Sequence, residues 1–300
     1  MSVTVCDVGP RDGLQNEPVT LEPVVRGALV ERLAAAGVPR IEAVSFVSPK
    51  AVPQMAGAEE VVAAVERRPG VVYAGLAVNE RGYDRLLESG LDEVHYAFAA
   101  TEEFNRRNAN ATVEDGVAGA EAIVARARAD GIRSTVTIGV AFGCPFEGAV
   151  DPGHVAELAA RLAASGADEL AVADTVGVGV PRQVRDLVGR LVALGVRVGV
   201  HLHNTRSTGI ANAYAALDAG ATVLDASVGG IGGCPFAPRA TGNVATEDLV
   251  YLLHGEGVST GIDLDALIEV GRMAERIVGH QMPSELLRAG SLDAFRKKAA

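Results

Sequence analysis

The hydrophobic pattern along the chain combines two periods. Amphipathic stretches with helical spacing are followed by a glycine and then by a short run rich in Val, Ile and Leu. The glycines stand where the C-terminus of a helix needs the left-handed backbone conformation. They are Gly37, Gly70, Gly90, Gly131, Gly166, Gly195 and Gly220. The recurrence predicts alternating helices and strands along the chain.

The apolar runs predict eight strands, and the amphipathic stretches between them predict the helices. The strands are expected at 3–8, 40–44, 71–78, 93–98, 134–140, 169–173, 196–201 and 222–227. Helical patterns occupy 23–36, 57–67, 113–129, 154–165, 181–194 and 209–219. This alternation is typical of parallel strands joined by crossover helices.

The number of units and the character of the strands predict the fold class. Several strands are apolar at nearly every position, and no linker rich in Pro, Ser or charge interrupts the chain. These features favour a closed α/β barrel, the (β/α)8 TIM barrel, over a doubly wound sheet. We expect one domain over 1–300, with 263–300 as a helical extension that covers the barrel or packs on a neighbouring subunit. Function is then expected at the C-terminal ends of the strands.

Composition excludes several classes of function. Hydrophobic residues make up 48% of the 300 residues and aromatic residues only 4%, which indicates a globular chain without an aromatic recognition surface. The net charge of -11 argues against binding to nucleic acid or to an anionic membrane. Three cysteines cannot form a disulfide framework, and no apolar run is long enough for a membrane span. We therefore expect a cytoplasmic protein that is neither exported nor anchored.

Four polar residues fall where neighbouring strands of the barrel would end. His201 and His203 flank one residue at the end of the seventh predicted strand, so both rings are expected on one face. Asp12 follows the first strand and Asn243 follows the eighth. Two imidazoles, a carboxylate and an amide oxygen suit Mg²⁺ or Mn²⁺ better than a structural zinc.

Two further residues are candidates for catalysis at the same end of the barrel. Arg11 precedes the proposed ligand Asp12 and is suited to stabilise an oxyanion or enolate, with a salt bridge or helix cap as its alternative role. Cys234 lies in the glycine-rich run 229–236, which is typical of a mobile loop that delivers a proton donor or acceptor. A buried, merely hydrophobic thiol is the alternative. Cys144 lines the site or packs, and Cys6 is expected in the core.

Carboxylates and histidines elsewhere on the strands and helices are less clear. Asp174 ends the sixth predicted strand and is expected to serve function, whereas Glu42 lies within a strand and fits equally well a buried ion pair with Arg11. His95 is open to the same two interpretations as Glu42. The remaining histidines are expected to be solvated and receive no role: His154, His254 and His280.

Seven co-linear segments resemble hydroxymethylglutaryl-CoA lyase over about residues 3 to 265. They are VGPRDGLQNE at 8–17, SFVSPK at 45–50, VPQM at 52–55, GCP at 143–145, DTVG at 174–177, GGCP at 232–235 and GNVATEDLVY at 242–251. The resemblance implies a (β/α)8 barrel that binds Mg²⁺ or Mn²⁺. It also implies cleavage of 3-hydroxy-3-methylglutaryl-CoA to acetyl-CoA and acetoacetate.

The resemblance also implies roles for individual residues. The implied metal ligands are Asp12, His201, His203 and Asn243, and the implied catalytic residues are Arg11 and Cys234, with Glu42 and Asp174 in the site. Gln15 is expected to contact the substrate. Asp174, His201 and water on the metal are all candidates to take the hydroxyl proton. The CoA phosphates are expected to meet Lys50, Arg106 and Arg107, unless these are ordinary solvated charges.

The chain departs from the family pattern at the walls of the expected site. Asn204 follows the two histidines where the family has Asp, and Thr135 and Thr137 stand where it has Arg and Tyr. The reaction type is therefore better supported than the substrate, and a different 3-hydroxyacyl-CoA is an alternative. A condensing acyltransferase of the same superfamily and a non-catalytic paralogue that binds metal or acyl-CoA are less favoured hypotheses. A homodimer is expected because the family and many barrels associate.

Overall fold

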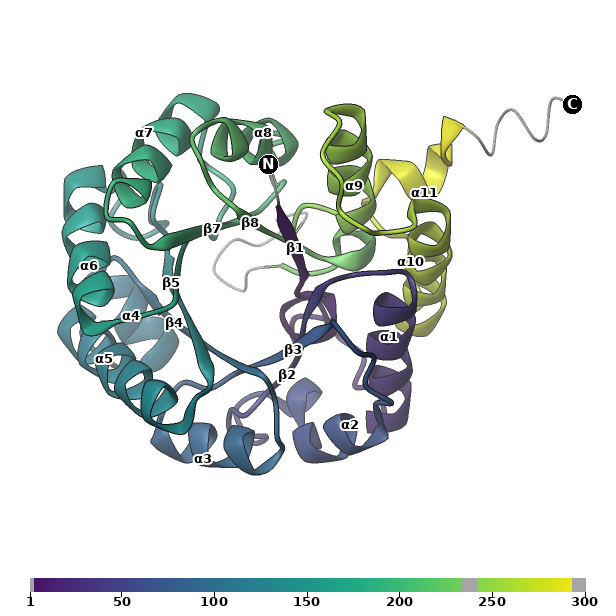
Figure 1. Ribbon diagram of the computed structural model, residues 1–300, viewed down its shortest axis with the longest axis horizontal. Helices are drawn as coiled ribbons and strands as arrows, with labels where there is room; N and C mark the ends of the chain where they lie inside the picture. The colour runs from purple at the N-terminus through teal and green to yellow at the C-terminus, as the bar shows by residue number, and fades with distance from the viewer. Residues whose placement is uncertain (1–2, 234–241, 293–300) are drawn as a thin grey trace, which may run out of the picture.

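Eight parallel strands close into a barrel in the computed structural model, which describes residues 3–233 and 242–292 (Figure 1). Each strand pairs with the next in sequence, and β1 also pairs with β8, so the order is β1 to β8 around the ring. The prediction of a TIM barrel is confirmed. The strands are β1 (Thr4–Asp7), β2 (Arg40–Ser45), β3 (Val72–Leu76), β4 (Glu93–Ala99), β5 (Arg133–Gly139), β6 (Glu169–Asp174), β7 (Arg197–Leu202) and β8 (Val223–Ala226).

A ring of helices surrounds the strands (Figure 1). The helices that follow the strands are α1 (Pro23–Ala35), α2 (Ala58–Ala64), α3 (Glu80–Glu88), α4 (Glu102–Ala109), α5 (Val113–Asp130), α6 (Pro152–Ser165), α7 (Pro181–Val192), α8 (Gly209–Asp218) and α9 (Thr246–Gly255). Apolar side chains of the strands and of the inner helix faces form the core between the two rings. No helix in residues 3–233 and 242–292 has the length and apolar character needed to cross a bilayer.

The C-terminal extension completes this helical ring. It contains α10 (Leu264–Val278) and α11 (Glu285–Ala289). α10 contacts both α9 and α1, so it occupies the place between the last and the first helix of the ring (Figure 1). The extension was expected either to cover the barrel or to pack on a neighbouring subunit. In the structure α10 packs on the barrel.

Three helices, α3, α4 and α9, fall outside the helical patterns recognised in the sequence. α3 and α4 are only nine and eight residues long and polar on average: α3 buries only Gly82, Tyr83 and Leu86, and α4 buries only Phe104 and Asn105. Within two turns of a polar helix few apolar positions repeat, so the periodic signal is weak. An N-cap marks α3 instead, because the Asn79 side chain accepts a hydrogen bond from the Gly82 amide at 2.8 Å.

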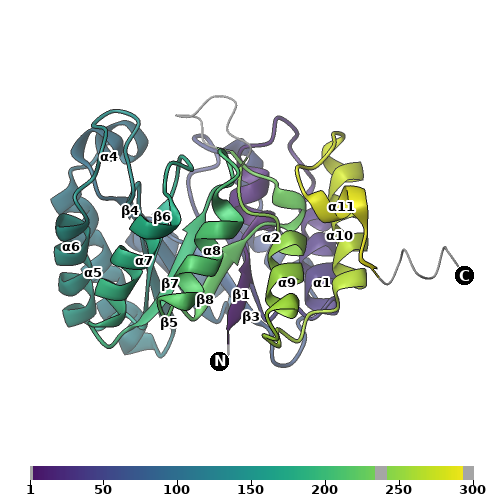
Figure 2. The same cartoon turned by 90° about the horizontal axis from the view of Figure 1, so that it is seen from above.

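The two mouths of the barrel differ in what they carry. The chain starts at one mouth, and α4 lies at the other, where the strands have their C-terminal ends (Figure 2). Near the first mouth lies a set of buried charges that we call the ionic layer, formed by the first residues of β2, β4 and β6: Arg40, Glu93 and Glu169. The opposite mouth carries the candidate site.

Candidate metal centre and active site

A short π-helical turn, η1 (Gly9–Gly13), places Arg11 and Asp12 at the C-terminal mouth of the barrel. Its backbone folds back on Val8, whose carbonyl accepts hydrogen bonds from the Asp12 amide at 2.7 Å and the Gly13 amide at 3.2 Å. Gly13 is required for close packing, since a Cβ there would lie 2.6 Å from the Ile231 side chain. Such turns often occur at functional sites, and the sequence pattern did not reveal this one.

Three potential metal ligands converge next to η1. One ligand atom each of Asp12, His201 and His203 lie within 4.8 Å of one another. β7 ends at Leu202, so His203 lies just beyond the strand rather than in it. It is held instead by a bridge to Asn243, which brings the predicted fourth ligand beside it. We call Asp12, His201, His203 and Asn243 the rim cluster.

The rim cluster presents buried acceptor atoms that lack partners. Within the described residues, His203 Nδ1 and Asn243 Oδ1 make no hydrogen bond, although both are buried. The amide nitrogen of Asn243 donates to Asp12 Oδ2 at 2.9 Å and to the Ile231 carbonyl at 3.1 Å. Buried polar atoms rarely stay unpaired; Asn243 Oδ1 carries lone pairs, and His203 Nδ1 carries one in the tautomer with its proton on Nε2. The donor set therefore fits a divalent cation with nitrogen and oxygen ligands.

Electrostatics keep two of the potential ligands in the form that binds a metal. Burial opposes charge on Asp12, but Arg11 and the two histidines outweigh it and lower the pKa of Asp12 to about 2. Burial, together with the neighbouring His201, lowers the pKa of His203 to about 4. Asp12 is thus ionised and His203 neutral at neutral pH, as metal ligation requires.

Asp225, which was not among the predicted site residues, hydrogen-bonds to the ring of His201. Its Oδ2 lies 3.3 Å from His201 Nδ1, and the two residues are in register on β8 and β7. Burial disfavours the charged ring, but the hydrogen bond to Asp225 and the charge of Asp12 raise the pKa of His201. A carboxylate behind a ligand histidine fixes the tautomer and makes the ring more basic. The available signal was that Asp225 is the one charged residue in the predicted strand 222–227.

Arg11 is fixed by two carboxylates. Its Nη1 donates to Asp12 Oδ1 at 2.8 Å, and its Nε and Nη2 lie 2.5 Å from Glu42 Oε2. Burial alone would favour a neutral Glu42, yet Arg11 and then His95 lower the pKa of this carboxyl. The ion pair with Arg11, one of the two interpretations of Glu42, is present in the structure. It leaves the guanidinium charged and held beside the rim cluster.

Asp174 lies at the same rim and holds the loop that follows β6. It is in register with Leu202, between the two histidines of the rim cluster. Its Oδ1 and Oδ2 accept hydrogen bonds from the amides of Val178 and Gly179, each at 2.9 Å. Burial raises the pKa of Asp174 in spite of these amides. The raised pKa favours proton uptake, while the two hydrogen bonds tie the carboxylate to its loop.

The predicted contacts to the acyl group lie at different depths. Gln15 is half-buried, and its Oε1 lacks a hydrogen-bond partner among the described residues. Thr135 is buried and donates to Glu93 Oε1 of the ionic layer at 2.6 Å. Thr137 is half-buried two residues further along β5, toward the rim. Of the two threonines, Thr137 is therefore the nearer to the rim.

The predicted contacts to the CoA phosphates lie on the outer part of the same mouth. Lys50 is exposed in the loop after β2. Arg106 and Arg107 lie on α4, with side chains 60% and 54% exposed, and each pairs with the glutamate one turn earlier. Arg107 also stacks over the Phe146 ring, 4.5 Å from its centroid. Each α4 arginine would thus have to exchange an intrahelical ion pair for a phosphate.

Of the three cysteines, Cys234 lies outside the described residues. The preceding Gly233 is described, and its carbonyl accepts a hydrogen bond from Asn16 Nδ2 at 3.0 Å, close to η1 in the chain. Cys144 is buried, and its sulfur accepts a hydrogen bond from the Thr101 hydroxyl at 3.1 Å. Cys6 is buried in the barrel, as expected, and burial raises the pKa of its thiol.

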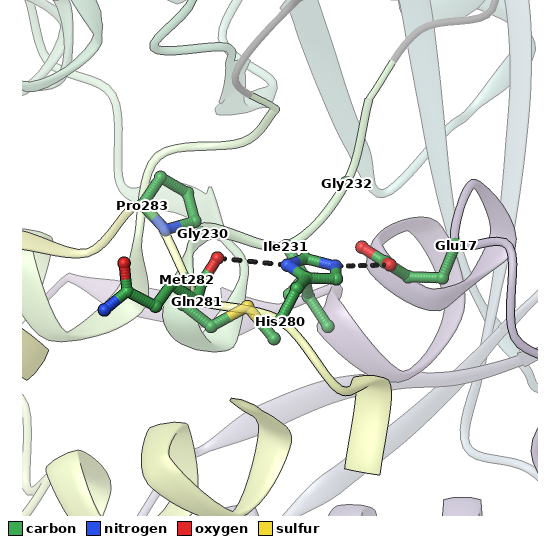
Figure 3. Close-up of a pocket in the computed structure, with 8 residues that line it drawn as sticks. All are labelled: Glu17, Gly230, Ile231, Gly232, His280, Gln281, Met282 and Pro283. Atoms are coloured by element: carbon green, nitrogen blue, oxygen red, sulfur yellow. Dashed lines mark hydrogen bonds and ion pairs between the residues drawn. The ribbon is translucent and has the colours of Figure 1, made fainter. Parts of the chain in front are cut away.

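A cavity of about 370 Å³ lies between the loop after β8, the segment after η1 and the C-terminal extension (Figure 3). Its lining residues are Glu17, Gly230, Ile231, Gly232, His280, Gln281, Met282 and Pro283. His280 is not merely solvated, because its Nε2 lies 2.7 Å from Glu17 Oε2 and its side chain is 48% exposed. The cavity borders the rim cluster through Gly232, where a Cβ would lie 2.6 Å from the amide nitrogen of Asn243.

Comparison with known proteins agrees with this geometry. A family model described as HMGL-like matches residues 2–274. The chain belongs to the HMGL-like family. It is 46% identical to (R)-citramalyl-CoA lyase of Chloroflexus aurantiacus, covering 96% of this chain and 95% of that protein. It is 44% identical to 3-hydroxy-3-isohexenylglutaryl-CoA/hydroxy-methylglutaryl-CoA lyase of Pseudomonas aeruginosa, covering 96% of each.

A solved structure supports the same assignment to the HMGL-like family. The HMG-CoA lyase of Acinetobacter baumannii, in complex with coenzyme A and 3-methylmalate, superposes with a TM-score of 0.92 at 38% identity, covering 97% of this chain and 96% of that one. The predicted family is confirmed, and the chain is a lyase. Members of the HMGL-like family generally use a divalent metal, and Asp12, His201 and His203 form a possible site for one.

Proposed function

We propose that the chain is a divalent-metal-dependent lyase that cleaves 3-hydroxy-3-methylglutaryl-CoA to acetyl-CoA and acetoacetate. The observation that carries this proposal is the convergence of Asp12, His201 and His203 within 4.8 Å, beside an arginine fixed by two carboxylates. A carbon-carbon lyase needs a group that activates a hydroxyl and a cation that stabilises an enolate. Both are available at this rim.

The rim cluster would hold Mg²⁺ or Mn²⁺ through Asp12, His201, His203 and Asn243. A bound divalent ion supplies Lewis acidity that orients the substrate oxygens and makes the tertiary hydroxyl more acidic. The orphaned Nδ1 of His203 and Oδ1 of Asn243 support these two as ligands. Asp225 would keep the other ring, that of His201, oriented.

The proposed reaction breaks the bond between C2 and C3 of the acyl group. Loss of the hydroxyl proton leaves the oxygen to form the ketone of acetoacetate, and the electron pair of the broken bond moves to C2. The resulting thioester enolate needs a cation, and the charged, fixed guanidinium of Arg11 is suited to stabilise it. Protonation of C2 then gives acetyl-CoA, and we assign this proton to the thiol of Cys234.

Two residues are the protein candidates for the base that takes the hydroxyl proton. Asp174 has a raised pKa and lies at the rim beside β7. His201 belongs to the rim cluster and is made more basic by Asp225. An Asp174→Asn variant separates the two, because the amide keeps the shape and an acceptor for the loop but cannot take a proton. We expect about a 100-fold loss of kcat if Asp174 is the base, and a smaller loss if it only holds the loop.

A second substrate is favoured by one specific comparison, the 46% identity to (R)-citramalyl-CoA lyase. In citramalyl-CoA the carboxylate is attached directly to the carbinol carbon, one carbon nearer than in 3-hydroxy-3-methylglutaryl-CoA. The same bond cleavage would then give acetyl-CoA and pyruvate. We propose that Gln15 and Thr137 contact the acyl group and discriminate between the two substrates.

The test is metal-dependent turnover of both thioesters, with chelator and metal-restored controls and products identified by mass. Acetoacetate and acetyl-CoA formation that stops on chelation supports the proposal. Pyruvate formation from citramalyl-CoA alone keeps the mechanism and changes the substrate, whereas cleavage of neither thioester contradicts the proposal. Cys234→Ser should lower turnover by about 100-fold and leave Mn²⁺ binding intact. Unchanged turnover in that variant would remove the thiol from the mechanism.

A further inference from the structure

Eight side chains of alternating sign form a continuous series of ion pairs from the rim to the opposite mouth of the barrel. Each consecutive pair lies between 2.5 and 3.4 Å apart. Of the eight, only Arg197 at the far end has a side chain that is a third exposed. In order the series is Asp12, Arg11, Glu42, His95, Glu93, Arg40, Glu169 and Arg197.

His95 links the half of the series at the rim to the half in the ionic layer. Its Nδ1 lies 3.0 Å from Glu42 Oε1, and its Nε2 lies 3.3 Å from Glu93 Oε1. The ring is buried, with 8% of its side chain exposed. Without His95, the carboxylates of Glu42 and Glu93 would share the barrel interior with no cation between them.

The two contacts of the ring favour a proton on both nitrogens: Nδ1 hydrogen-bonds to Glu42, and Nε2, which makes no hydrogen bond among the described residues, faces Glu93 as an ion pair. A neutral imidazole has one N–H and one lone pair, so either tautomer would turn a lone pair toward a carboxylate. Glu93 Oε1 cannot supply the missing proton, because it already accepts hydrogen bonds from Arg40 Nη1 at 2.8 Å and from the Thr135 hydroxyl at 2.6 Å. At Glu42 the oxygen that faces His95 is Oε1, while Oε2 accepts from Arg11, whose charge keeps the carboxylate ionised.

Within these eight residues the charges balance when His95 is an imidazolium, and beyond Asp12 the ion pairs continue to His201 and Asp225. Four cations then face four carboxylates: Arg11, His95, Arg40 and Arg197 against Asp12, Glu42, Glu93 and Glu169. Burial disfavours the charged ring, but the hydrogen bonds and charges of Glu42 and Glu93 raise the pKa of His95 to about 10. On its other side β3 places the apolar Leu76 in register with His95.

We propose that His95 is a positioning residue for the reaction, a permanent buried cation that keeps Glu42 ionised and aimed at Arg11. Arg11 takes one Glu42 oxygen through both Nε and Nη2, and His95 occupies the other oxygen. With both oxygens engaged, the carboxylate has a single orientation. His95 therefore sets the place of the guanidinium without touching the substrate. This inference rests on the proposed function of Arg11 at the rim.

The first experiment compares His95→Gln with His254→Gln. His254 lies on α9 and contacts only the Thr260 hydroxyl in the described part of the chain, so its variant controls for the loss of a histidine. In His95→Gln we expect kcat to fall by about 100-fold, with KM for the cleaved acyl-CoA nearly unchanged, because a displaced catalytic group costs turnover rather than binding. We also expect the activity of the variant to fall as the pH is lowered, over a range where the wild type keeps its activity, because Glu42 takes up a proton more readily without the neighbouring cation.

A readout that needs no activity keeps this proposal separate from the proposed function. The ¹⁵Nε–¹Hε signal of Arg11, assigned with Arg11→Lys, reports the hydrogen bond to Glu42 in the free protein. We expect it to shift or broaden in His95→Gln and to stay unchanged in His254→Gln. An unchanged Arg11 signal together with unchanged kcat overturns the proposal, whether or not the substrate has been identified.

A compensating variant tests the charge balance directly. His95→Gln leaves the series with one excess negative charge, and adding Glu93→Gln restores neutrality. We expect the double variant to recover at least about tenfold of the lost kcat and a wild-type Arg11 signal, the coupling that a double-mutant cycle detects. No recovery in the double variant contradicts the proposal. If His95→Gln does not fold, the test is an NMR titration of the His95 ring in the wild-type protein. A titration midpoint below pH 7 would overturn the proposal of a permanent imidazolium.

Discussion

The rim cluster and the ionic layer are both largely buried polar groups in one barrel, and each holds atoms without a hydrogen bond, such as Glu93 Oε2 in the ionic layer, but their charges are balanced differently. In the ionic layer Arg40 lies 2.8 Å from both Glu93 and Glu169, so opposite charges face each other. In the rim cluster two imidazoles and a carboxylate converge, and the buried acceptors of His203 and Asn243 have no partner in residues 3–233 and 242–292.

The difference separates a structural role from a functional one. A buried charge that already has its counter-ion needs no bound ion to balance it. A buried group of acceptors without donors is complete only when something else binds. This distinction leads to four predictions: one residue each from the rim cluster and the ionic layer, then a buried acid without a counter-ion, and last an exposed cation at the edge of the mouth that carries the rim cluster.

The largest effect is expected at the rim. Asp12→Asn removes the negative ligand and leaves Arg11 paired only with Glu42, so Mn²⁺ binding and turnover should both be lost. We expect turnover below about one thousandth of the wild type, because changes behind a ligand already cost 10- to 100-fold. Calorimetric titration with Mn²⁺ and the acyl-CoA assay measure the two losses. Retained Mn²⁺ affinity in this variant would exclude Asp12 as a ligand.

The ionic layer should show the opposite behaviour. Glu169→Gln keeps the shape but leaves Arg40 without its carboxylate on β6, which Arg40 contacts at 2.8 Å. Breaking a buried pair on one side costs about 3 to 5 kcal/mol in the free energy of unfolding. Urea unfolding measures this loss, while kcat of the folded variant should stay close to wild type. A large fall in kcat of the folded variant would show that the ionic layer also serves the reaction, so that the two regions do not have separate roles.

Asp7, the last residue of β1, is a buried acid that forms no ion pair with a cation in the described part of the chain. Its oxygens accept hydrogen bonds from the Gly9 amide at 2.9 Å and the Thr246 hydroxyl at 2.7 Å. Burial, only partly offset by these hydrogen bonds, raises the pKa of Asp7 from 3.8 to about 6. The folded protein therefore holds this proton more tightly than the unfolded chain does.

The sign of the pH dependence follows from that difference. The stabilising contribution of Asp7 is fully present below about pH 4 and is lost as the pH rises through about 6. The loss amounts to about 3 kcal/mol, because one pKa unit corresponds to about 1.4 kcal/mol. Asp7→Asn should remove this part of the decline when urea unfolding is compared at pH 4.5 and 7.5. Parallel curves for wild type and variant would mean that Asp7 is ionised throughout.

The smallest effect is expected at the exposed edge of the rim. Lys50→Gln removes one solvated charge that we expect near the CoA phosphates, so KM for acyl-CoA should rise by about fivefold with kcat unchanged. Arg185→Gln is the matched control, because Arg185 is an exposed cation on α7 that pairs with Asp218. Equal KM values for the two variants would place Lys50 outside the CoA site.

Much of the fold was predictable because the barrel repeats one local pattern. Apolar strands and glycine-ended helices predicted the eight strands, and the residues that follow β1, β7 and β8 predicted three sides of the rim cluster. α3 and α4 were missed because they are only nine and eight residues long and polar on average, so few apolar positions repeat within them. Asp225 was missed because its role depends on its register with His201 and not on its neighbours in sequence.

The sequence by itself determined the class of fold, the end of the barrel that carries the site and the kinds of ligand gathered there. Those properties depend on residue type and on position within a local repeat. Only the tertiary structure decided which partner each buried charge has. It separated Asp12, beside unpaired acceptors, from Glu169, whose charge is already balanced, and it placed His95 between two carboxylates from different strands. Pairing between strands depends on barrel closure and register, and no local sequence pattern records these.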